Sequence, residues 1–428
     1  MLIVIMMILF ICMFLGVPIA VALGWASIGG ILASIYYIPL EVVPQRLFTA
    51  VDSFPLLAIP FFMLAGEFMM AGSMAKRITN IAFSCVGWIR AGLAQVSTLT
   101  SMFFAGISGS GAADTAAVGK MMIPMMEEKG YDKGFAAATV ATAGTIAVVI
   151  PPSIPMIVYG VTAGVSIGSL FTAGIIPGII LGISIMLLNY FLTKRQNYQN
   201  ETQRFELISL KKALKEGVLA LLLPIIIVVG IRGGIFTPTE AGAVASGYAF
   251  FVSKFIYKDL KWSEIVTAFL RAAQMTAMVI FIIAVANLFG WILTAEQIPQ
   301  HLANTITSIT NNPNIILLFI NLILFITGCF LNASAAITIL TPLLLPLAMS
   351  VGIDPIHLGV VMVVNLAIGL ITPPVGLDLY IIQGIANVSF DKLIKSIVPF
   401  ILLLIIILMM ITYIPQLSLF LSELFNKL

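Results

Sequence analysis

Long hydrophobic runs alternate with short polar breaks along almost the whole chain. The runs lie near residues 2–36, 55–72, 79–108, 112–126, 135–161, 167–193, 217–231, 236–257, 264–294, 314–331, 335–350, 356–385 and 394–424. Because a membrane-spanning helix needs about 20 apolar residues, these runs predict an all-α polytopic membrane protein with on the order of a dozen passes. The opening run continues past Leu32 without a basic leader, which predicts a first membrane helix and not a cleaved signal.

The composition places these runs in a lipid bilayer. Hydrophobic residues make up 61% of the chain and charged residues 9%, whereas a soluble domain has about 25% charged residues. The net charge of +3 is spread along the chain, so nucleic acid is not an expected partner. The chain contains no HExxH, GxSxG or Walker A motif, and its three cysteines lie in apolar runs. These observations argue against an enzyme, a metal cluster and a disulfide framework.

Two stretches repeat one pattern at a constant spacing. Residues 106–152 read GISGSGAADTAAVGKMMIPMMEEKGYDKGFAAATVATAGTIAVVIPP, and residues 328–374 read GCFLNASAAITILTPLLLPLAMSVGIDPIHLGVVMVVNLAIGLITPP. Gly106 aligns with Gly328, and Asp132 aligns with Asp354, each 222 residues apart without a gap. Such a repeat in an apolar chain is typical of a secondary transporter built from two related halves.

The repeat divides the chain. We expect a first repeat over residues 1–193, a hydrophilic connector over 194–216 and a second repeat over 217–428, with a transport core near 95–165 and 315–385. The connector is the one sizeable hydrophilic stretch, and we interpret it as solvated and partly helical.

The lysines and arginines of equivalent loops favour opposite orientations of the two repeats. Residues 71–80 and 127–134 contain two basic residues each, while their counterparts 294–304 and 349–358 contain none. Further along the bias reverses, because 162–172 contains none and 387–396 contains Lys392 and Lys395. Short cytoplasmic loops are enriched in Lys and Arg, so the pattern predicts inverted repeats.

Each repeat carries two breaks in its apolar pattern. The first is a small polar cluster, SGSGAADT at 108–115 and NASAA at 332–336, which predicts the tip of a re-entrant hairpin. The second is a proline pair, at 151–152 and 373–374, where a helix must open. Either feature alone also fits close helix packing or a simple kink. Matched copies of both features at one constant spacing favour a functional site over these simpler explanations.

The breaks predict an ion and substrate site near the membrane midplane. Half-helix N-termini offer N–H groups to an anion, and unwound carbonyls with hydroxyl oxygens suit a small cation such as Na⁺. We predict two cation cages, one in each repeat. The ligands of the first cage are Ser108, Ser110, Gly144, Thr145 and Pro151, and those of the second cage are Gly328, Asn332, Ser334, Gly369, Thr372 and Pro373. We predict substrate contacts at Ser110, Asp114, Ser153, Asn332 and Asp378. Asp114 also fits a helix cap, and Asp378 also fits a position at the membrane interface.

Four segments resemble the large membrane subunit of tripartite ATP-independent periplasmic (TRAP) transporters. They are residues 106–152, GIFTPTEAGAVA at 234–245, SFPLLAIPFFMLAGEFM at 53–69 and NLAIGLITPPVG at 365–376. The resemblance covers essentially the whole chain. Within the family, the sequence looks like the sialic acid branch. The resemblance implies a sodium-driven importer of carboxylates, either sugar acids or C4-dicarboxylates, in the bacterial inner membrane.

The resemblance also implies a mechanism and partners. The mechanism would be that of an elevator, in which hairpins and broken helices slide against a scaffold. The partners would be a small four-helix membrane subunit, expected here as a separate chain, and a soluble periplasmic substrate-binding protein. Two alternatives remain: a related divalent-anion symporter that works alone and, more distantly, a channel. No ring-forming filter motif supports the channel.

Overall fold

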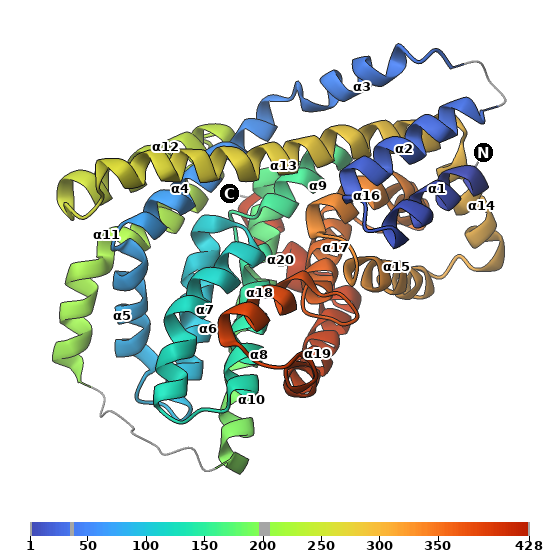
Figure 1. Cartoon of the computed structure of the whole chain (residues 1–428). Helices are drawn as coiled ribbons and strands as arrows, with labels where there is room; N and C mark the ends of the chain where they lie inside the picture. The colour runs from blue at the N-terminus through green and yellow to red at the C-terminus, as the bar shows by residue number, and fades with distance from the viewer. Residues whose placement is uncertain (1, 35–37, 197–205, 427–428) are drawn as a thin grey trace.

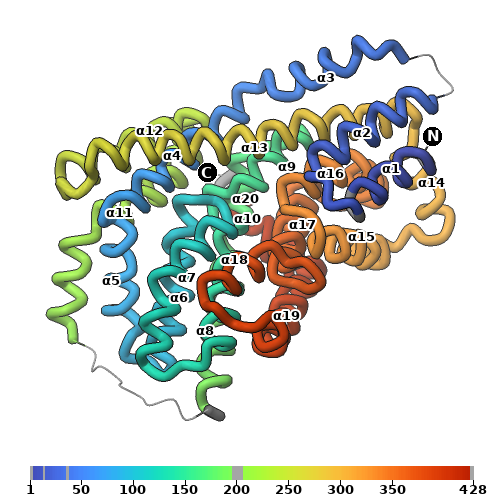
Figure 2. The backbone as a smooth tube through the Cα atoms, in the orientation of Figure 1, coloured from blue at the N-terminus to red at the C-terminus, as the bar shows by residue number. Residues whose placement is uncertain are grey.

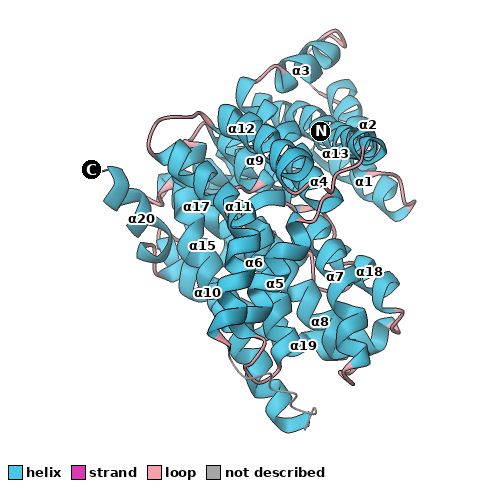
Figure 3. Cartoon of the chain, turned by 90° about the vertical axis from the view of Figure 1, so that its left-hand side faces the viewer, coloured by secondary structure: helices cyan, strands magenta, loops and turns pink. Residues whose placement is uncertain are grey.

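The computed structural model describes residues 2–34, 38–196 and 206–426, and all regular structure in these ranges is helical (Figures 1 and 3). The first half contains α1 (Leu2–Phe14), α2 (Ile19–Leu32), α3 (Val42–Val51), η1 (Phe54–Leu57), α4 (Ala58–Ala71), α5 (Met74–Val86), α6 (Gly92–Ser108), α7 (Gly111–Glu128), α8 (Lys133–Gly144), η2 (Thr145–Val148), α9 (Ile154–Ala163) and α10 (Ile167–Gln196). The second half contains α11 (Leu207–Arg232), α12 (Pro238–Phe251), η3 (Val252–Ile256), α13 (Trp262–Ala295), α14 (Ile298–Ile309), α15 (Pro313–Gly328), α16 (Ala333–Ser350), α17 (Pro355–Gly369), α18 (Leu377–Ala386), α19 (Phe390–Tyr413) and α20 (Gln416–Asn426). The all-α prediction is confirmed.

The two repeats fold into the same series of elements. In each, two helices meet at a polar tip, α6 with α7 and α15 with α16. A helix broken at the proline pair follows, as α8 and α9 in the first repeat and α17 and α18 in the second. The predicted hairpins and breaks are therefore confirmed at both copies. We call α6–α9 and α15–α18 the hairpin core.

Several predicted runs have different limits in the structure. The prediction of one first membrane helix is wrong, because α1 and α2 are separate helices that pack against each other. Gly16, at φ +72°, and Pro18 interrupt the run between them. The connector is largely absorbed into helices, since α10 continues to Gln196 and α11 begins at Leu207; residues 197–205 lie outside the described ranges. Among the described residues, six helical stretches are long and apolar enough to cross a membrane unaided.

An outer layer of helices lies along one side of the hairpin core (Figure 1). We define this outer layer as α2, α3, α4, α12 and α13. The long helix α13 packs against α2, α3 and α4, and α12 packs against α4. A capping box sets the start of α12, because the Thr237 hydroxyl accepts from the Glu240 N–H while the Glu240 carboxylate accepts from the Thr237 N–H. The outer layer reaches the core mainly where α13 packs against α16 and α4 packs against α6.

Within the core, each broken helix packs against the hairpin of the other repeat. The half-helix α9 lies against α16, and α18 lies against α7 (Figure 2). Two hydrogen bonds also cross between the repeats: Tyr159 Oη donates to the Pro355 carbonyl at 2.6 Å, and Thr115 Oγ1 donates to Asp378 Oδ2 at 3.4 Å. The hairpin core is consequently one body to which both repeats contribute.

Buried asparagines join the supporting helices in each repeat. In the first, Asn189 on α10 accepts from Thr139 on α8 at 3.2 Å and donates to Thr98 on α6 at 3.1 Å. In the second, Asn365 on α17 donates to Asn321 on α15 at 2.7 Å, and Asn321 donates to Thr412 Oγ1 on α19 at 3.1 Å. Lipid tails are as apolar as the helices, so the hydrophobic effect does not drive membrane helices together. Hydrogen bonds between buried polar side chains can hold the helices together instead.

Equivalent aspartates start the two broken helices. Asp132 accepts from the N–H groups of Gly134 and Phe135 at the start of α8. Asp354, its counterpart 222 residues later, caps α17 in the same way. Partial burial alone would raise the pKa of Asp132, but the Lys392 ammonium and the two capping N–H groups hold that pKa below its ordinary value. The Lys392 contact, at 2.5 Å, ties the α7–α8 turn to α19.

We expect the two repeats to have opposite orientations in the membrane. Exposed single cysteines at Glu128 and Lys395 should react with a membrane-impermeant maleimide from one side, and those at Ser350 and Ser166 from the other. The background should carry alanine at the three native cysteines. Labelling of positions 128 and 350 from the same side would contradict the inverted arrangement.

Candidate functional site

Four helices begin at one cavity, the central cavity, which lies between the hairpin core and the outer-layer helices α4 and α13. The cavity has a volume of about 190 Å³, and the first residues of α7, α9, α16 and α18 form much of its wall. Each helix N-terminus carries unpaired N–H groups and about half a positive charge, so all four direct positive potential into the same space. Among the described residues that line the cavity, none is Lys, Arg or His. The positive potential at this wall therefore comes from the helix starts, and Asp378 is the one acidic residue among the lining residues.

The start of each helix is set by a break in the sequence. Ser110, Ser153 and Asn332 accept hydrogen bonds from the backbone N–H groups of Ala113, Met156 and Ala335, at 3.4, 3.3 and 2.9 Å. The fourth helix, α18, follows Gly376 at φ +57°. Both proline pairs contain a cis peptide bond. Pro and small polar residues thus expose helix starts where an uninterrupted membrane helix would bury its backbone.

Each hairpin tip is held to the break of its own repeat by a backbone hydrogen bond. The Ile154 N–H donates to the Gly109 carbonyl at 3.3 Å, and the Gly376 N–H donates to the Cys329 carbonyl at 3.2 Å. The two donors are 222 residues apart, so they are equivalent positions. Gly109 has φ +61°, and a Cβ there would lie 2.6 Å from the Pro152 carbonyl oxygen. This tip conformation requires glycine.

Asp114 lies beneath the first tip and is 1% exposed. Ser108 Oγ donates to one oxygen of its carboxyl group, and the Ser110 N–H donates to Ser108 Oγ at 3.2 Å. The other oxygen, Oδ2, is buried without a hydrogen-bond partner. Asp114 lies in the first turn of α7, but the helix cap is Ser110, so the alternative interpretation of Asp114 as the cap is wrong. An orphaned carboxylate oxygen of this kind fits a cation ligand.

Asp378 comes from the second repeat but faces the first tip. It lines the central cavity and is fully buried within the protein. Its Oδ2 accepts from Thr115, and its Oδ1 is buried without a partner. Thr115 Oγ1 also lies against Gly144. Oxygen atoms from both repeats thus gather where the first cation cage was predicted.

The remaining predicted ligands fall into two groups. Ser110, Asn332 and Ser334 line the central cavity. The hydroxyls of Thr145, Ser153 and Thr372 instead donate to the carbonyls of Thr142, Val148 and Ile368, at 2.7, 2.5 and 2.7 Å. Ser153 is fully buried and is not among the lining residues, although its neighbours Ile154 and Pro155 are. The hydroxyls of the second group are thus bonded to backbone carbonyls near the breaks of the two repeats.

Backbone contacts close both predicted cages. Gly144 lies so near Gly111 that a Cβ on Gly144 would be 3.2 Å from the Gly111 carbonyl oxygen. In the second repeat, a Cβ on Gly369 would be only 2.5–2.7 Å from three backbone atoms of Gly328. Pro151 and Pro373, the first prolines of their pairs, follow Gly144 and Gly369 along the chain. The arrangement brings carbonyl oxygens of the hairpins and breaks together.

Sequence reasoning missed the apolar side of the cavity. Met63 on α4 and Met275, Met278 and Val279 on α13 complete its wall. These residues lie in ordinary hydrophobic runs, with no polar or glycine signal to single them out. They place the outer layer directly against the site.

Paired hairpins, paired broken helices and a central cavity in an apolar chain define the class of secondary transporters built from repeats. The chain belongs to the family described as tripartite ATP-independent periplasmic transporter, DctM component, whose model matches residues 6–417. The resemblance found in the sequence is confirmed. Members of this family are transporter permeases and not enzymes.

Three relatives illustrate the similarity. The chain is 43% identical over 405 residues to the isethionate TRAP transporter permease protein DctMQ of Oleidesulfovibrio alaskensis, covering 95% of this chain but 64% of that longer protein. It is 43% identical over 374 residues to the C4-dicarboxylate TRAP transporter large permease protein DctM of Pseudomonas aeruginosa, covering 87% of each. It is 37% identical over 415 residues to the sialic acid TRAP transporter large permease protein SiaM of Vibrio cholerae, covering 96% of each.

The fold is also similar to a solved structure. The crystal structure of the Alcanivorax borkumensis YdaH transporter matches with a TM-score of 0.65 at 14% identity, covering 89% of each chain. At this identity the likeness concerns the fold alone.

We expect Gly369→Ala to disrupt the second cage. Its Cβ would collide with the Gly328 backbone, so the hairpin must shift, at a cost of about 1–3 kcal/mol. Thermal unfolding in detergent and transport after reconstitution should both decline. Gly384→Ala on α18 is the matched control, since a Cβ there meets nothing within 4 Å. Equal behaviour of the two variants would contradict the close contact.

Proposed function

We propose that this chain is the membrane permease of a sodium-coupled importer of a small organic carboxylate. The observation that carries the proposal is the convergence of four helix N-termini on one cavity, next to the orphaned oxygens of Asp114 and Asp378. The N-termini favour an anion, whereas the carboxylates and carbonyls favour a cation. A site with both features suits coupled binding of the two ions.

The first cation cage would use oxygen atoms of both repeats. Thr115 Oγ1 lies 3.4 Å from Asp378 Oδ2. A Cβ on Gly111 would be 3.3 Å from that same oxygen and 3.2 Å from the Gly144 carbonyl oxygen. Hard oxygen ligands without sulfur or imidazole suit Na⁺ better than a transition metal.

The second cage would lie at the equivalent contact in the other repeat. There the Gly328 carbonyl approaches Gly369, next to the Thr372–Pro374 break. Asn332 and Ser334 lie on the cavity side of this contact. The two cages would place two cations around the central cavity.

The carboxylate would bind between the tips. Backbone N–H groups at the helix starts and the side chains of Ser110 and Asn332 are the donors available on the cavity wall. Asp378 lies on the same wall and would repel an anion unless a cation were bound beside it. Substrate affinity would then depend on Na⁺, and Na⁺ affinity on the substrate by the same factor.

The substrate class follows from this chemistry and from the relatives. Their names cite a C4-dicarboxylate, sialic acid and isethionate. All three are small organic oxyanions, which fits a cavity whose positive potential comes from backbone dipoles. A sugar acid or C4-dicarboxylate remains the proposed substrate of this chain.

Movement would take the form of an elevator. The hairpin core contains every predicted ligand, while the outer layer contributes mainly methionines and Val279 to the cavity wall. Unbranched methionine side chains adapt to changed neighbours, so they can form a sliding contact. The core would carry the site past the outer layer in the bacterial inner membrane.

We expect the tip variants to weaken substrate binding in proteoliposomes. Loss of one neutral donor in Ser110→Ala or Asn332→Ala should cost about 0.5–1.5 kcal/mol, a several-fold rise in substrate KM. Gly111→Val should do more harm, because its side chain would meet Val148 and Asp378. Ser153→Ala should mainly lower stability, since its hydroxyl caps α9. Unchanged KM and rate in all variants, or uptake that ignores Na⁺, would contradict the proposal.

We also expect full uptake only with two partners, a small four-helix membrane subunit and a periplasmic binding protein. The family is tripartite by description. Proteoliposomes containing this chain alone should transport poorly, and addition of both partners should restore Na⁺-driven uptake. Full uptake by the chain alone would favour the stand-alone divalent-anion symporter.

A further inference from the structure

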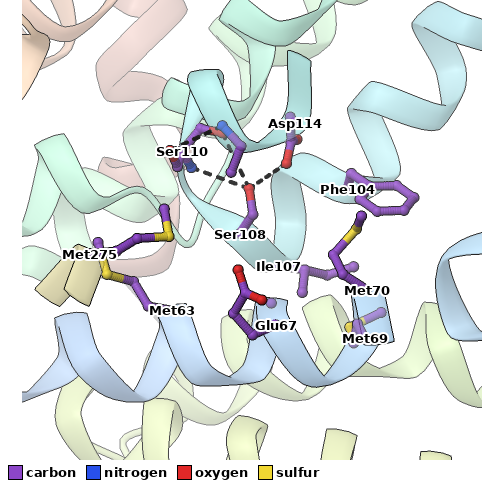
Figure 4. Close-up of a pocket in the computed structure, with 12 residues that line it drawn as sticks. Met63, Glu67, Met69, Met70, Phe104, Ile107, Ser108, Ser110, Asp114 and Met275 are labelled. Carbon is purple, nitrogen blue, oxygen red and sulfur yellow. Dashed lines mark hydrogen bonds between the residues drawn. The ribbon is translucent and has the colours of Figure 1, made fainter. Parts of the chain in front are cut away.

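A second, smaller cavity lies on the other side of the first hairpin tip, between the tip and α4. Its volume is about 30 Å³, the size of a site for one small ion or water. Its oxygen-bearing lining residues are Glu67, Ser108, Ser110 and Asp114 (Figure 4). Methionines of α4 and α13 surround these oxygens.

Glu67 faces the tip from the outer layer. The preceding residue, Gly66, lies against the tip, because a Cβ on Gly66 would be in ordinary contact with Ser108 Cα at 3.5 Å. The Glu67 carboxylate points toward Ser108 (Figure 4). Its side chain is 19% exposed, and its charged partner is Arg271 on α13, whose Nη1 lies 3.9 Å from Glu67 Oε2.

The oxygen atoms around this cavity are not all paired. Asp114 Oδ2 is buried without a hydrogen-bond partner, and none of the ion pairs between described residues involves Asp114. Arg271 lies at a long distance from Glu67, and its side chain is 66% exposed. Two carboxyl groups therefore face one small cavity that contains no basic side chain. A bound cation would supply the missing charge.

We propose that Glu67, Ser108, Ser110 and Asp114 form a binding site for a monovalent cation, Na⁺ in the first instance, between α4 and the first hairpin tip. The inference rests on the proposed sodium coupling. It assigns Ser108 and Ser110, which the sequence placed in the first cage, to a separate site on the α4 side of the tip, and it adds Glu67 to them. Because Glu67 belongs to the outer layer and Asp114 to the hairpin core, a cation here would bridge the two bodies. This site would hold a coupling ion only while the tip lies against α4.

Variants of Glu67 and Arg271 test the proposed site, because they should change the Na⁺ concentration for half-maximal uptake in opposite directions. Glu67→Gln removes a negative ligand, so the Na⁺ concentration for half-maximal uptake should rise about fivefold or more. Arg271→Gln removes a competing positive charge but leaves the carboxylate, so the same concentration should fall. A merely structural ion pair would make both variants worse in the same direction.

The measurement is Na⁺-activated uptake in proteoliposomes with the partners present, at saturating substrate, with choline replacing Na⁺. Asp391→Asn, at an exposed carboxylate in the first turn of α19, is the control and should not change the Na⁺ dependence. Shifts of the two α4–α13 variants in the same direction, or no shift with Glu67→Gln while wild-type uptake follows Na⁺, would overturn the site and leave the proposed function standing.

A direct binding experiment tests the cation site independently of the proposed transport function. Purified full-length protein is heated in NaCl or choline chloride, and ²²Na⁺ binding is counted directly. We expect Na⁺ to raise the unfolding temperature of the wild type and less so that of Glu67→Gln, with reduced ²²Na⁺ retention. If wild-type uptake ignores Na⁺, the proposed function fails, and this experiment alone decides the site. Equal retention by wild type and Glu67→Gln would overturn it.

Discussion

Unpaired backbone N–H groups at membrane depth are the constraint on which the site depends. A continuous membrane helix satisfies its own backbone, so a helix start within the apolar region is tolerated only where it meets protein or a polar cavity. This chain places four such starts together, at the beginnings of α7, α9, α16 and α18. Serine and asparagine caps satisfy part of each start. The remaining donors and their dipoles make the centre of an otherwise apolar molecule suitable for ions.

Neither repeat could build this centre alone. Each broken helix packs against the hairpin of the other repeat, and Asp378 reaches Thr115 across the boundary. The asparagine networks around Asn189 and Asn365 then fix the supporting helices on either side. A change in one repeat is therefore felt at ligands of the other. Asp378 itself breaks the symmetry, because its equivalent in the first repeat is Met156.

The sequence predicted the architecture well where a local signal exists. Proline pairs and polar tips cannot be accommodated in a plain membrane helix, so the hairpins and breaks were found at the correct positions. The division of the first apolar run was missed because Gly16 and Pro18 are weak signals inside an otherwise uniform stretch. Met63, Met275 and Glu67 could not be assigned to the site at all, since their relevance arises only from the packing of α4 and α13 against the tip. Ser153 was predicted as a substrate contact, but it does not line the cavity, because the local turn directs its hydroxyl to the Val148 carbonyl.

The hydrogen bonds from Ile154 to Gly109 and from Gly376 to Cys329 have a consequence for how the chain can vary in length. Each residue added to a helix turns everything beyond it by about 100° and advances it about 1.5 Å. One inserted residue in a hairpin arm would thus rotate the tip away from its break and redirect a helix start out of the cavity. Tolerance of insertions should therefore be nearly absent between residues 106 and 152, as in their counterparts 328–374.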